Sequence, residues 1–208
     1  MPELSTLLTY IAILTGFVFF PGPSILLTLT RSSTSGARVG VATSLGIALG
    51  DLVHTVMAVV GISAILLTSA QAFTVIKLLG AGYLIYIGLR SLFEGRLNTK
   101  PEATVPISVR QAFRQACVAE ILNPKSAMFF LAFLPQFVDP RLGHIAMQLM
   151  ILGLLFVLMG AVATLVVAFA AGHVGRFLRR NPSVQRWQSK VVGSIYCALG
   201  IRLAFQER

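Results

Sequence analysis

The sequence predicts an all-α polytopic membrane protein whose six transmembrane helices form two inverted three-helix repeats. Two observations predict the membrane class: 56% of the 208 residues are hydrophobic while 12% are charged, and the mean hydropathy is +0.82. Soluble domains carry about 25% charged residues, so a water-soluble fold of this composition would lack the charge to cover its surface. A third observation, a proline-containing break at a matching place in each half, predicts the repeats.

Six apolar runs are long enough, or nearly so, to cross a bilayer as helices, which need about 20 residues. The runs are continuous, whereas the strands of a membrane barrel alternate, and helices satisfy their own backbone groups in lipid. The sixth run is the shortest, and whether it spans decides the side of the C-terminus. In order, the runs cover residues 4–30, 39–68, 72–93, 112–137, 144–172 and 190–205.

The net charge of +10 does not indicate nucleic-acid binding, because the basic residues lie between the apolar runs rather than in one patch. The positive-inside rule makes these basic connections cytoplasmic and puts both termini outside. They are the first, third and fifth connections, with Arg31 and Arg38, then Arg96, Lys100, Arg110 and Arg114, then Arg176, Arg179, Arg180, Arg186 and Lys190.

A single transmembrane domain is predicted over residues 1–208, with repeat one at 1–93, a linker at 94–110 and repeat two at 111–208. Three segments per half is an odd number, so the halves must have opposite orientations, as in many secondary transporters. A short motif at the end of each half supports this division. It comprises Ala81, Gly88, Arg90 and Phe93 in the first half and Gly193, Gly200, Arg202 and Phe205 in the second.

Pro21, Gly22 and Pro23 interrupt the first apolar run. Proline removes a backbone donor and disrupts the preceding helical turn, so two prolines around a glycine should unwind or kink the helix. The freed carbonyl groups and the positive end of the new half-helix could bind a substrate, with a carboxylate at that positive end. The alternative is a structural kink whose polar groups are satisfied by neighbouring helices.

Asn123, Pro124 and Lys125 form the matching break in the fourth run. An ammonium group inside a membrane should be paired or face water, so Lys125 could contact a substrate carboxylate or balance a nearby acid; it could equally snorkel to the interface. Glu120, one turn earlier, could bind a substrate ammonium group, neutralise Lys125 or lie near the cytoplasmic interface. These residues join the first break as candidates for substrate binding.

Asp51 and His54 lie in the middle of the second run, three residues apart and so on one helix face. Ionisable groups at membrane depth mark transport pathways or proton relays. We expect Asp51 to couple proton entry to solute exit, assisted by His54. The alternative is a buried structural pair that locks helices together.

Several short motifs follow one another over nearly the whole chain, at residues 16–23, 36–40, 46–50, 77–88, 122–125 and 133–137. Together they resemble the LysE/RhtB family of amino-acid exporters. The resemblance implies a multi-pass protein of the bacterial inner membrane that exports lysine, arginine, threonine, homoserine, leucine or related metabolites, driven by the proton gradient. It also implies functional roles for Pro21, Pro23, Asp51, Asn123, Pro124 and Lys125.

Two positions depart from the pattern of the family, which often has glycine at the place of Ala116 and asparagine at the place of Glu120. An extra acid beside the site could change the charge of the preferred substrate. The Pro-Gly-Pro and Asn-Pro-Lys pattern implies a neutral amino acid such as threonine or homoserine. Export of a basic amino acid or another cation is the alternative.

Other classes of function fit the sequence poorly. No nucleotide-binding, metal-ligand or glycine-flanked serine motif is present, so we expect no cofactor, no metal and no enzyme activity, although Ser24 and His54 could be cast as nucleophile and base. A membrane scaffold or channel is a further alternative. The expected partners are an amino acid, protons, membrane lipid and, because six helices make a small bundle, a second copy of the chain.

Overall fold

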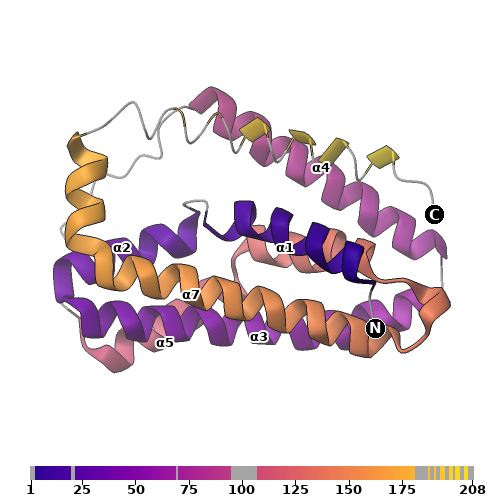
Figure 1. The fold of residues 1–208 in the computed structure, drawn as a ribbon, viewed down its shortest axis with the longest axis horizontal. Helices are drawn as coiled ribbons and strands as arrows, with labels where there is room; N and C mark the ends of the chain where they lie inside the picture. The colour runs from indigo at the N-terminus through magenta and orange to yellow at the C-terminus, as the bar shows by residue number, and fades with distance from the viewer. Residues whose placement is uncertain are drawn as a thin grey trace.

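The computed structural model describes residues 3–19, 22–68, 70–94 and 107–180, together with residues 187, 190, 193–194, 197–198, 200–201 and 204–205. All regular elements in these residues are helical, as the sequence predicts. Figure 1 shows long helices lying along one common axis, with the connections at the two ends. Such an arrangement satisfies the backbone hydrogen bonds within each helix, which a membrane interior requires.

The first predicted segment is one helix broken in two. α1 (Leu4–Val18) and α2 (Pro23–Ser35) meet at a bend of 49°. Gly22 is the N-cap of α2, and Pro23 occupies the first helical position, where its missing N–H disrupts no helical hydrogen bond. The bend lies where the Pro-Gly-Pro motif predicts it, while Pro21 itself lies outside the described residues.

Two unbroken helices complete the first half. α3 (Ala37–Thr68) and α4 (Ala70–Glu94) agree with the second and third predicted segments to within two residues at each end. Gly36 separates α2 from α3 and adopts a φ of 86°, which glycine tolerates without strain. A single residue therefore reverses the chain direction between these helices.

The fourth predicted segment is also broken. α5 (Val109–Ile121) is followed by the short α6 (Pro124–Met128), with a bend of 43° between the two halves of the segment. α6 continues into a π-helical turn, η1 (Phe129–Phe133), and a 3-10 turn, η2 (Leu134–Phe137). Non-α turns inside a helix often mark functional regions, and these follow directly after the break.

The last long element differs from its prediction at one end. After a short 3-10 turn, η3 (Pro140–Leu142), α7 runs from Ile145 to Arg180 and so passes the predicted end at residue 172. Arg176, Arg179 and Arg180 therefore belong to the helix and not to a loop. Arginine is a good helix former, and a helix that leaves the bilayer has no need to end at its apolar boundary.

Two helices are long and apolar enough to cross a membrane by themselves, over Ala37–Ile62 of α3 and Ile145–Ala171 of α7. Each broken pair, α1 with α2 and α5 with the helical turns after it, also qualifies when it is taken as one span. Leu78–Arg90 of α4 is a shorter apolar helix. Only separate residues of the sixth predicted segment, and no continuous helix, are described, so the count of six stays a prediction.

The helices place their basic ends together. In Figure 1 the connection from α2 to α3, the start of α5 and the end of α7 lie at the same end of the bundle. Arg31, Arg38, Arg110 and Arg114 belong to these ends. The described helix ends that flank the basic connections therefore lie together at one end of the folded molecule.

α4 packs against the second half through small residues. A Cβ atom at Gly80 would lie 2.0 Å from the Cβ of Ala132 in η1, so the two backbones approach as closely as glycine allows. The described residues of the last segment run beside α4 in Figure 1. There a Cβ at Gly88 would lie 2.8 Å from the Gly193 carbonyl oxygen, and a Cβ at Gly200 would lie 2.8 Å from that of Ala81.

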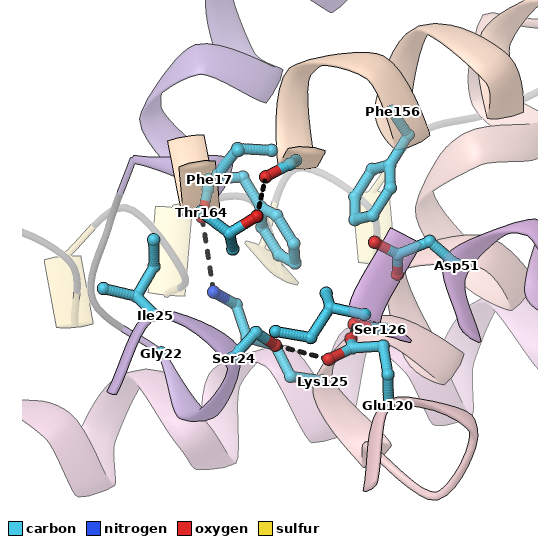
Figure 2. A pocket seen from close by; sticks show the side chains of 13 residues that line it. Phe17, Gly22, Ser24, Ile25, Asp51, Glu120, Lys125, Ser126, Phe156 and Thr164 are labelled. Atoms are coloured by element: carbon cyan, nitrogen blue, oxygen red, sulfur yellow. Dashed lines mark hydrogen bonds between the residues drawn. The ribbon is translucent and has the colours of Figure 1, made fainter. Parts of the chain in front are cut away.

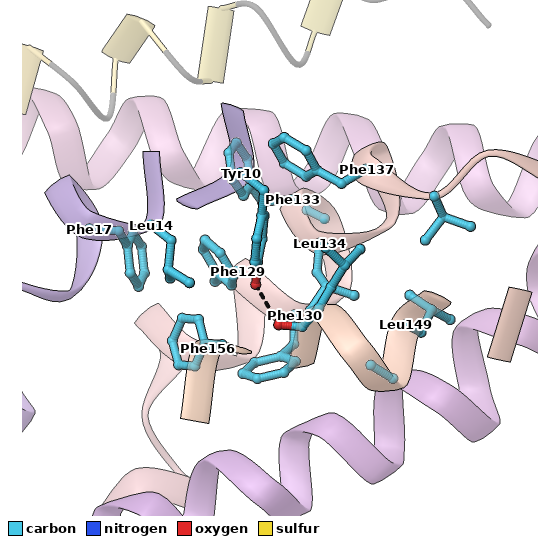
Figure 3. Close-up of a cluster of buried hydrophobic side chains, with 14 of the residues drawn as sticks. Tyr10, Leu14, Phe17, Phe129, Phe130, Phe133, Leu134, Phe137, Leu149 and Phe156 are labelled. Carbon is cyan, nitrogen blue, oxygen red and sulfur yellow. Dashed lines mark hydrogen bonds between the residues drawn. The ribbon is translucent and has the colours of Figure 1, made fainter. Parts of the chain in front are cut away.

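An aromatic cluster fills the interior beyond the two breaks, between α1, η1, η2 and α7 (Figure 3). The ring of Tyr10 lies 5.0 Å from that of Phe137, and its hydroxyl donates a 2.8 Å hydrogen bond to the Leu152 carbonyl. Phe129 and Phe156 stand 4.7 Å apart. Tilted and edge-on contacts of this kind stabilise by about 0.5–1.5 kcal/mol per pair, so the cluster holds the ends of both broken helices in place.

Candidate functional site

The two breaks meet at a small, partly open cavity (Figure 2). Its walls come from both broken helices and from α3 and α7, and its volume is about 40 Å³, which holds only a few water molecules. Four of the predicted site residues line it: Gly22, Asp51, Glu120 and Lys125. Segments that are about 100 positions apart in the sequence thus form one site.

The first break contributes backbone groups. The N-terminus of α2 has no side-chain cap, because its N-cap residue is Gly22. The first-turn amide groups of a helix are unpaired donors at the positive end of the helix dipole. A Cβ atom at Gly22 would lie 2.8 Å from Lys125 Nζ, so the absence of a side chain lets the lysine pass beside this helix end.

The second break contributes side chains. Asn123 caps α6 itself, because its Oδ1 accepts a 3.0 Å hydrogen bond from the Lys125 amide, and Pro124 occupies the first helical position. Asn123 is buried, and its Nδ2 also donates to Ser24 Oγ at 3.3 Å. The positive end of α6 is therefore already occupied by the chain's own amide oxygen.

Lys125 reaches from the second break to the first. Its Nζ donates a 3.3 Å hydrogen bond to the carbonyl of Phe17, in the last turn of α1, and lies 4.2 Å from the centre of the Phe17 ring. The ammonium group also interacts electrostatically with Glu120 and Asp51. The side chain points into the cavity in Figure 2, which leaves pairing, rather than snorkelling to the interface, as its arrangement.

Glu120 is the centre of a hydrogen-bond network that joins the two broken helices. Its Oε2 accepts a 2.5 Å bond from Ser24 Oγ of α2. Its Oε1 accepts a 3.0 Å bond from Asn123 Nδ2 and a further bond from the hydroxyl of Ser126 in α6. The side chain is 3% exposed, so Glu120 lies inside the bundle rather than at an interface.

Asp51 lies against Glu120 and faces the cavity (Figure 2). It is 3% exposed, and its Oδ1 has no hydrogen-bond partner among the described residues. Gly160 of α7 lies behind it, where a Cβ atom would be 3.4 Å from Asp51 Oδ2. A buried oxygen without a donor is costly, so this atom offers an acceptor to a ligand or a proton.

His54 shares a helix face with Asp51, but its ring is bound elsewhere. Its Nε2 donates a 3.0 Å hydrogen bond to the backbone carbonyl of Glu120, and the ring stacks on that of Phe130 at 5.6 Å. In this position His54 fastens α3 to the end of α5 and so orients Glu120. Its assistance in proton transfer stays a prediction.

Three residues that bond the charged side chains of the site were not predicted as ligands: Phe17, Ser24 and Ser126. Both serines stand in the first turn after a break, following Pro23 in one half and Pro124-Lys125 in the other. A serine at this place in both halves is a sequence pattern from which both hydroxyl groups could have been predicted as part of the site. Phe17 contributes through its backbone carbonyl and ring, and no local sequence pattern predicts that role.

The donor set of the cavity suits an organic ion better than a metal. In the described part of the chain, no group of three or more His, Cys, Asp or Glu side chains is placed to hold a metal ion. The cavity instead combines two acids, one base and several hydroxyl groups. Groups of both charges in one buried site can hold a molecule that carries an ammonium and a carboxylate group.

The chain is similar to known proteins over almost its whole length. Residues 15–207 match the family model described as LysE type translocator. A membrane protein of Pseudomonas aeruginosa is 29% identical over 94% of this chain and 93% of its own length, and one of Vibrio cholerae is 29% identical over 95% of each. The membrane protein YrhP of Bacillus subtilis is 31% identical over 95% of this chain and 97% of its own length. No solved structure matches the chain.

Proposed function

The chain belongs to the family of LysE type translocators, and on this premise we propose that it exports an amino acid across the bacterial cytoplasmic membrane in exchange for protons. The observation that carries the proposal is the meeting of Asp51, Lys125 and the uncapped start of α2 in one small cavity. These groups offer an acceptor for an ammonium group and donors for a carboxylate, the two groups that all amino acids share.

The orientation of the bound amino acid follows from these charges. Its carboxylate would lie at the amide groups of the first turn of α2, beside Lys125, because a helix N-terminus and an ammonium group both favour an anion. Its ammonium group would lie at Asp51, whose Oδ1 has no other partner among the described residues. Ile25, Ile47 and Phe156 belong to the apolar part of the wall and would face the cargo side chain.

Two classes of cargo fit this arrangement of charged and apolar groups. Resemblance of the Pro-Gly-Pro and Asn-Pro-Lys motifs favours a small neutral amino acid of the threonine or homoserine kind. A basic amino acid is the second candidate, and one observation favours it: the cavity contains two acids, Asp51 and Glu120, and one base, Lys125. The excess of negative charge would suit a cargo with an additional positive charge.

Alternating access is supported by contacts between the halves. In the predicted repeat, Ala81 corresponds to Gly193 and Gly88 to Gly200. Gly88 approaches Gly193 while Gly200 approaches Ala81, which is the reciprocal pattern of a two-fold axis. Two inverted halves related by such an axis can rock about a central site and open it to either side in turn.

We propose that two closures separate the cavity from the two sides of the membrane. Toward the basic end of the bundle, α2 and α5 are joined by the Ser24–Glu120 bond and by a 2.8 Å bond from Arg31 to Gln115. Toward the other end, the aromatic cluster around Tyr10 fills the interior. The positive-inside rule makes the polar closure cytoplasmic, with both termini outside.

Reconstituted transport tests the function. Proteoliposomes of the full chain are loaded with labelled threonine, homoserine, leucine, lysine or arginine, and efflux is measured with and without an imposed proton gradient. We expect efflux of at least one of these amino acids that depends on the gradient and stops when a protonophore is added. Efflux equal to that of protein-free liposomes for all five amino acids would contradict the proposal.

The coupling role of Asp51 is tested in the same vesicles. We expect Asp51→Asn to abolish gradient-driven efflux, because the amide cannot take up and release a proton. Asp51→Glu, which keeps the carboxyl group, should retain measurable coupling and serves as the control. Gradient-driven efflux that survives Asp51→Asn would show that Asp51 is not the coupling group.

A further inference from the structure

We propose that Glu120 determines the charge of the cargo: with Glu120 present, the cavity exchanges one proton for one amino acid that carries a net positive charge. The inference rests on the proposed function and names the substrate class of the same site. It depends on which of the two acids, Asp51 or Glu120, stays ionised and on how many charges the cavity contains. It also depends on which group neutralises the excess negative charge.

Glu120 has the surroundings of an ionised carboxylate. Three donors point at it: the hydroxyl groups of Ser24 and Ser126 and the amide of Asn123. A carboxylate accepts at both oxygens, whereas a carboxylic acid must use one of them as a donor. Because the donors occupy both oxygens of Glu120, protonation of this residue would break a bond between the two broken helices.

Asp51 has the surroundings of the protonated acid. Its buried Oδ1 has no hydrogen-bond donor among the described residues, so a negative charge on Asp51 would lack the donors that Glu120 has. Gly50, next to Asp51 in α3, lets α3 and α5 approach closely and brings the two acids near each other, because a Cβ atom there would lie 2.6 Å from the Cβ of Glu120. Because its three donors stabilise Glu120 as a carboxylate, the acid that holds a proton is Asp51.

A count of the charges around this pair leads to the same assignment. Lys125 of α6 faces it as a cation, and His54 of α3 uses its ring N–H on the Glu120 carbonyl. The wall contributed by α7 consists of Phe156, Gly160 and Thr164, which carry no charge. Two carboxylates and one ammonium group leave one negative charge in excess, and a buried uncompensated charge is strongly unfavourable.

One additional positive charge therefore balances the cavity. In the empty state it is the proton on Asp51. A zwitterionic amino acid adds no net charge and leaves that proton in place, whereas a cationic amino acid brings the charge itself and lets the proton leave. Proton and cationic cargo thus occupy the site alternately, which is the requirement for exchange.

Glu120→Gln removes one negative charge and keeps the size of the side chain. The remaining Asp51 and Lys125 then balance each other, so the cavity should favour a zwitterion. L-arginine and L-citrulline are suitable probes, because they are similar in shape and only arginine has a charged side chain. We expect the protein to favour arginine over citrulline by about tenfold or more, Glu120→Gln to lose or invert this preference, and Glu120→Asp to keep it.

Proton release measures the exchange directly. In weakly buffered solution at neutral pH, binding of arginine to the purified chain should release about one proton per bound molecule, and binding of citrulline to Glu120→Gln should release none. Transport with an arginine-to-citrulline ratio that Glu120→Gln leaves unchanged would overturn the inference while the proposed function stands. Failure of the chain to transport any amino acid would instead contradict the proposed function.

A cargo-free measurement decides the charge count even when no cargo is found. Infrared spectra of the purified chain in lipid should show a protonated carboxyl band that disappears in Asp51→Asn and, at neutral pH, also in Glu120→Gln. Lys125→Met should enlarge the band, because the cavity then needs a second proton, and this variant gives an answer if Glu120→Gln does not fold. A band that persists unchanged in Glu120→Gln, or does not grow in Lys125→Met, would refute the assignment.

Discussion

The two broken helices contribute in different ways to one site. At the first break, between α1 and α2, the chain leaves backbone groups open: α2 has no side-chain cap, and the Phe17 carbonyl at the end of α1 accepts a bond from Lys125 of the other half. At the second break, Asn123 caps α6 by itself. A proline begins the helix after each break, but the N-terminus of α2 lacks a side-chain cap, whereas the N-terminus of α6 has one.

The difference shows how a pair of similar breaks can form a complete site. The first break supplies donors and acceptors that are held by the backbone, and its glycine leaves room beside them. The second break satisfies its own helix end and supplies the charged side chains Glu120 and Lys125. Each break lacks what the other offers, so the cavity exists only where the two meet.

The largest expected effect comes from removing the charge that the second break supplies. Lys125→Met should lower efflux on the order of a hundredfold, because the cargo carboxylate loses a buried ionic partner, an interaction with a typical effect of about 2–5 kcal/mol. Lys125→Arg keeps the charge and should retain more activity. Equal efflux by Lys125→Met and the unmodified chain would remove the lysine from the binding site.

A smaller effect is expected when the first break loses its open space. Gly22→Ala places a Cβ atom 2.8 Å from Lys125 Nζ, and the resulting displacement of the ammonium group should lower efflux about tenfold to a hundredfold. Gly16→Ala is the matched control, because nothing lies within 4 Å of a Cβ atom there. If both variants transported equally well, the close approach at Gly22 would have no functional importance.

The smallest effect should come from the cap of the second break, and it concerns stability first. Asn123→Ala removes an N-cap, which typically destabilises by about 1 kcal/mol, and it should lower the midpoint of thermal unfolding by a few degrees. Ser108→Ala removes the capping box of α5, far from the cavity, and should destabilise similarly. Efflux should fall in Asn123→Ala alone, because Asn123 also bonds Glu120 and Ser24.

Much of the fold can be predicted from the sequence because a lipid environment restricts the backbone to few structures. A long apolar run has to form a helix when no water can satisfy its backbone, so α3 and α4 agree with their predicted bounds to within two residues. The two breaks are predictable for a similar reason, since proline cannot continue a regular helix. The end of α7 could not be predicted from hydropathy, because a helix can continue through basic residues into water.

The site could be predicted in part. Residues of both breaks and Asp51 do meet at one cavity, while the ring of His54 bonds the backbone carbonyl of Glu120, and its assistance to Asp51 stays a prediction. Spacing along a helix shows which residues share a face, but it does not show which neighbouring helix they meet. The contribution of Ser24 is equally invisible in local pattern, because its partner Glu120 lies in the other half of the chain.

The sequence by itself determined that this protein spans a membrane and where its helices break, because hydropathy and proline act within a few residues. Tertiary structure alone decided that Lys125 bonds the Phe17 carbonyl, that Glu120 gathers donors from both broken helices, and that Asp51 keeps an oxygen open to the cavity. These contacts join residues that are far apart in the chain. Their geometry depends on how whole helices pack, which no short stretch of sequence specifies.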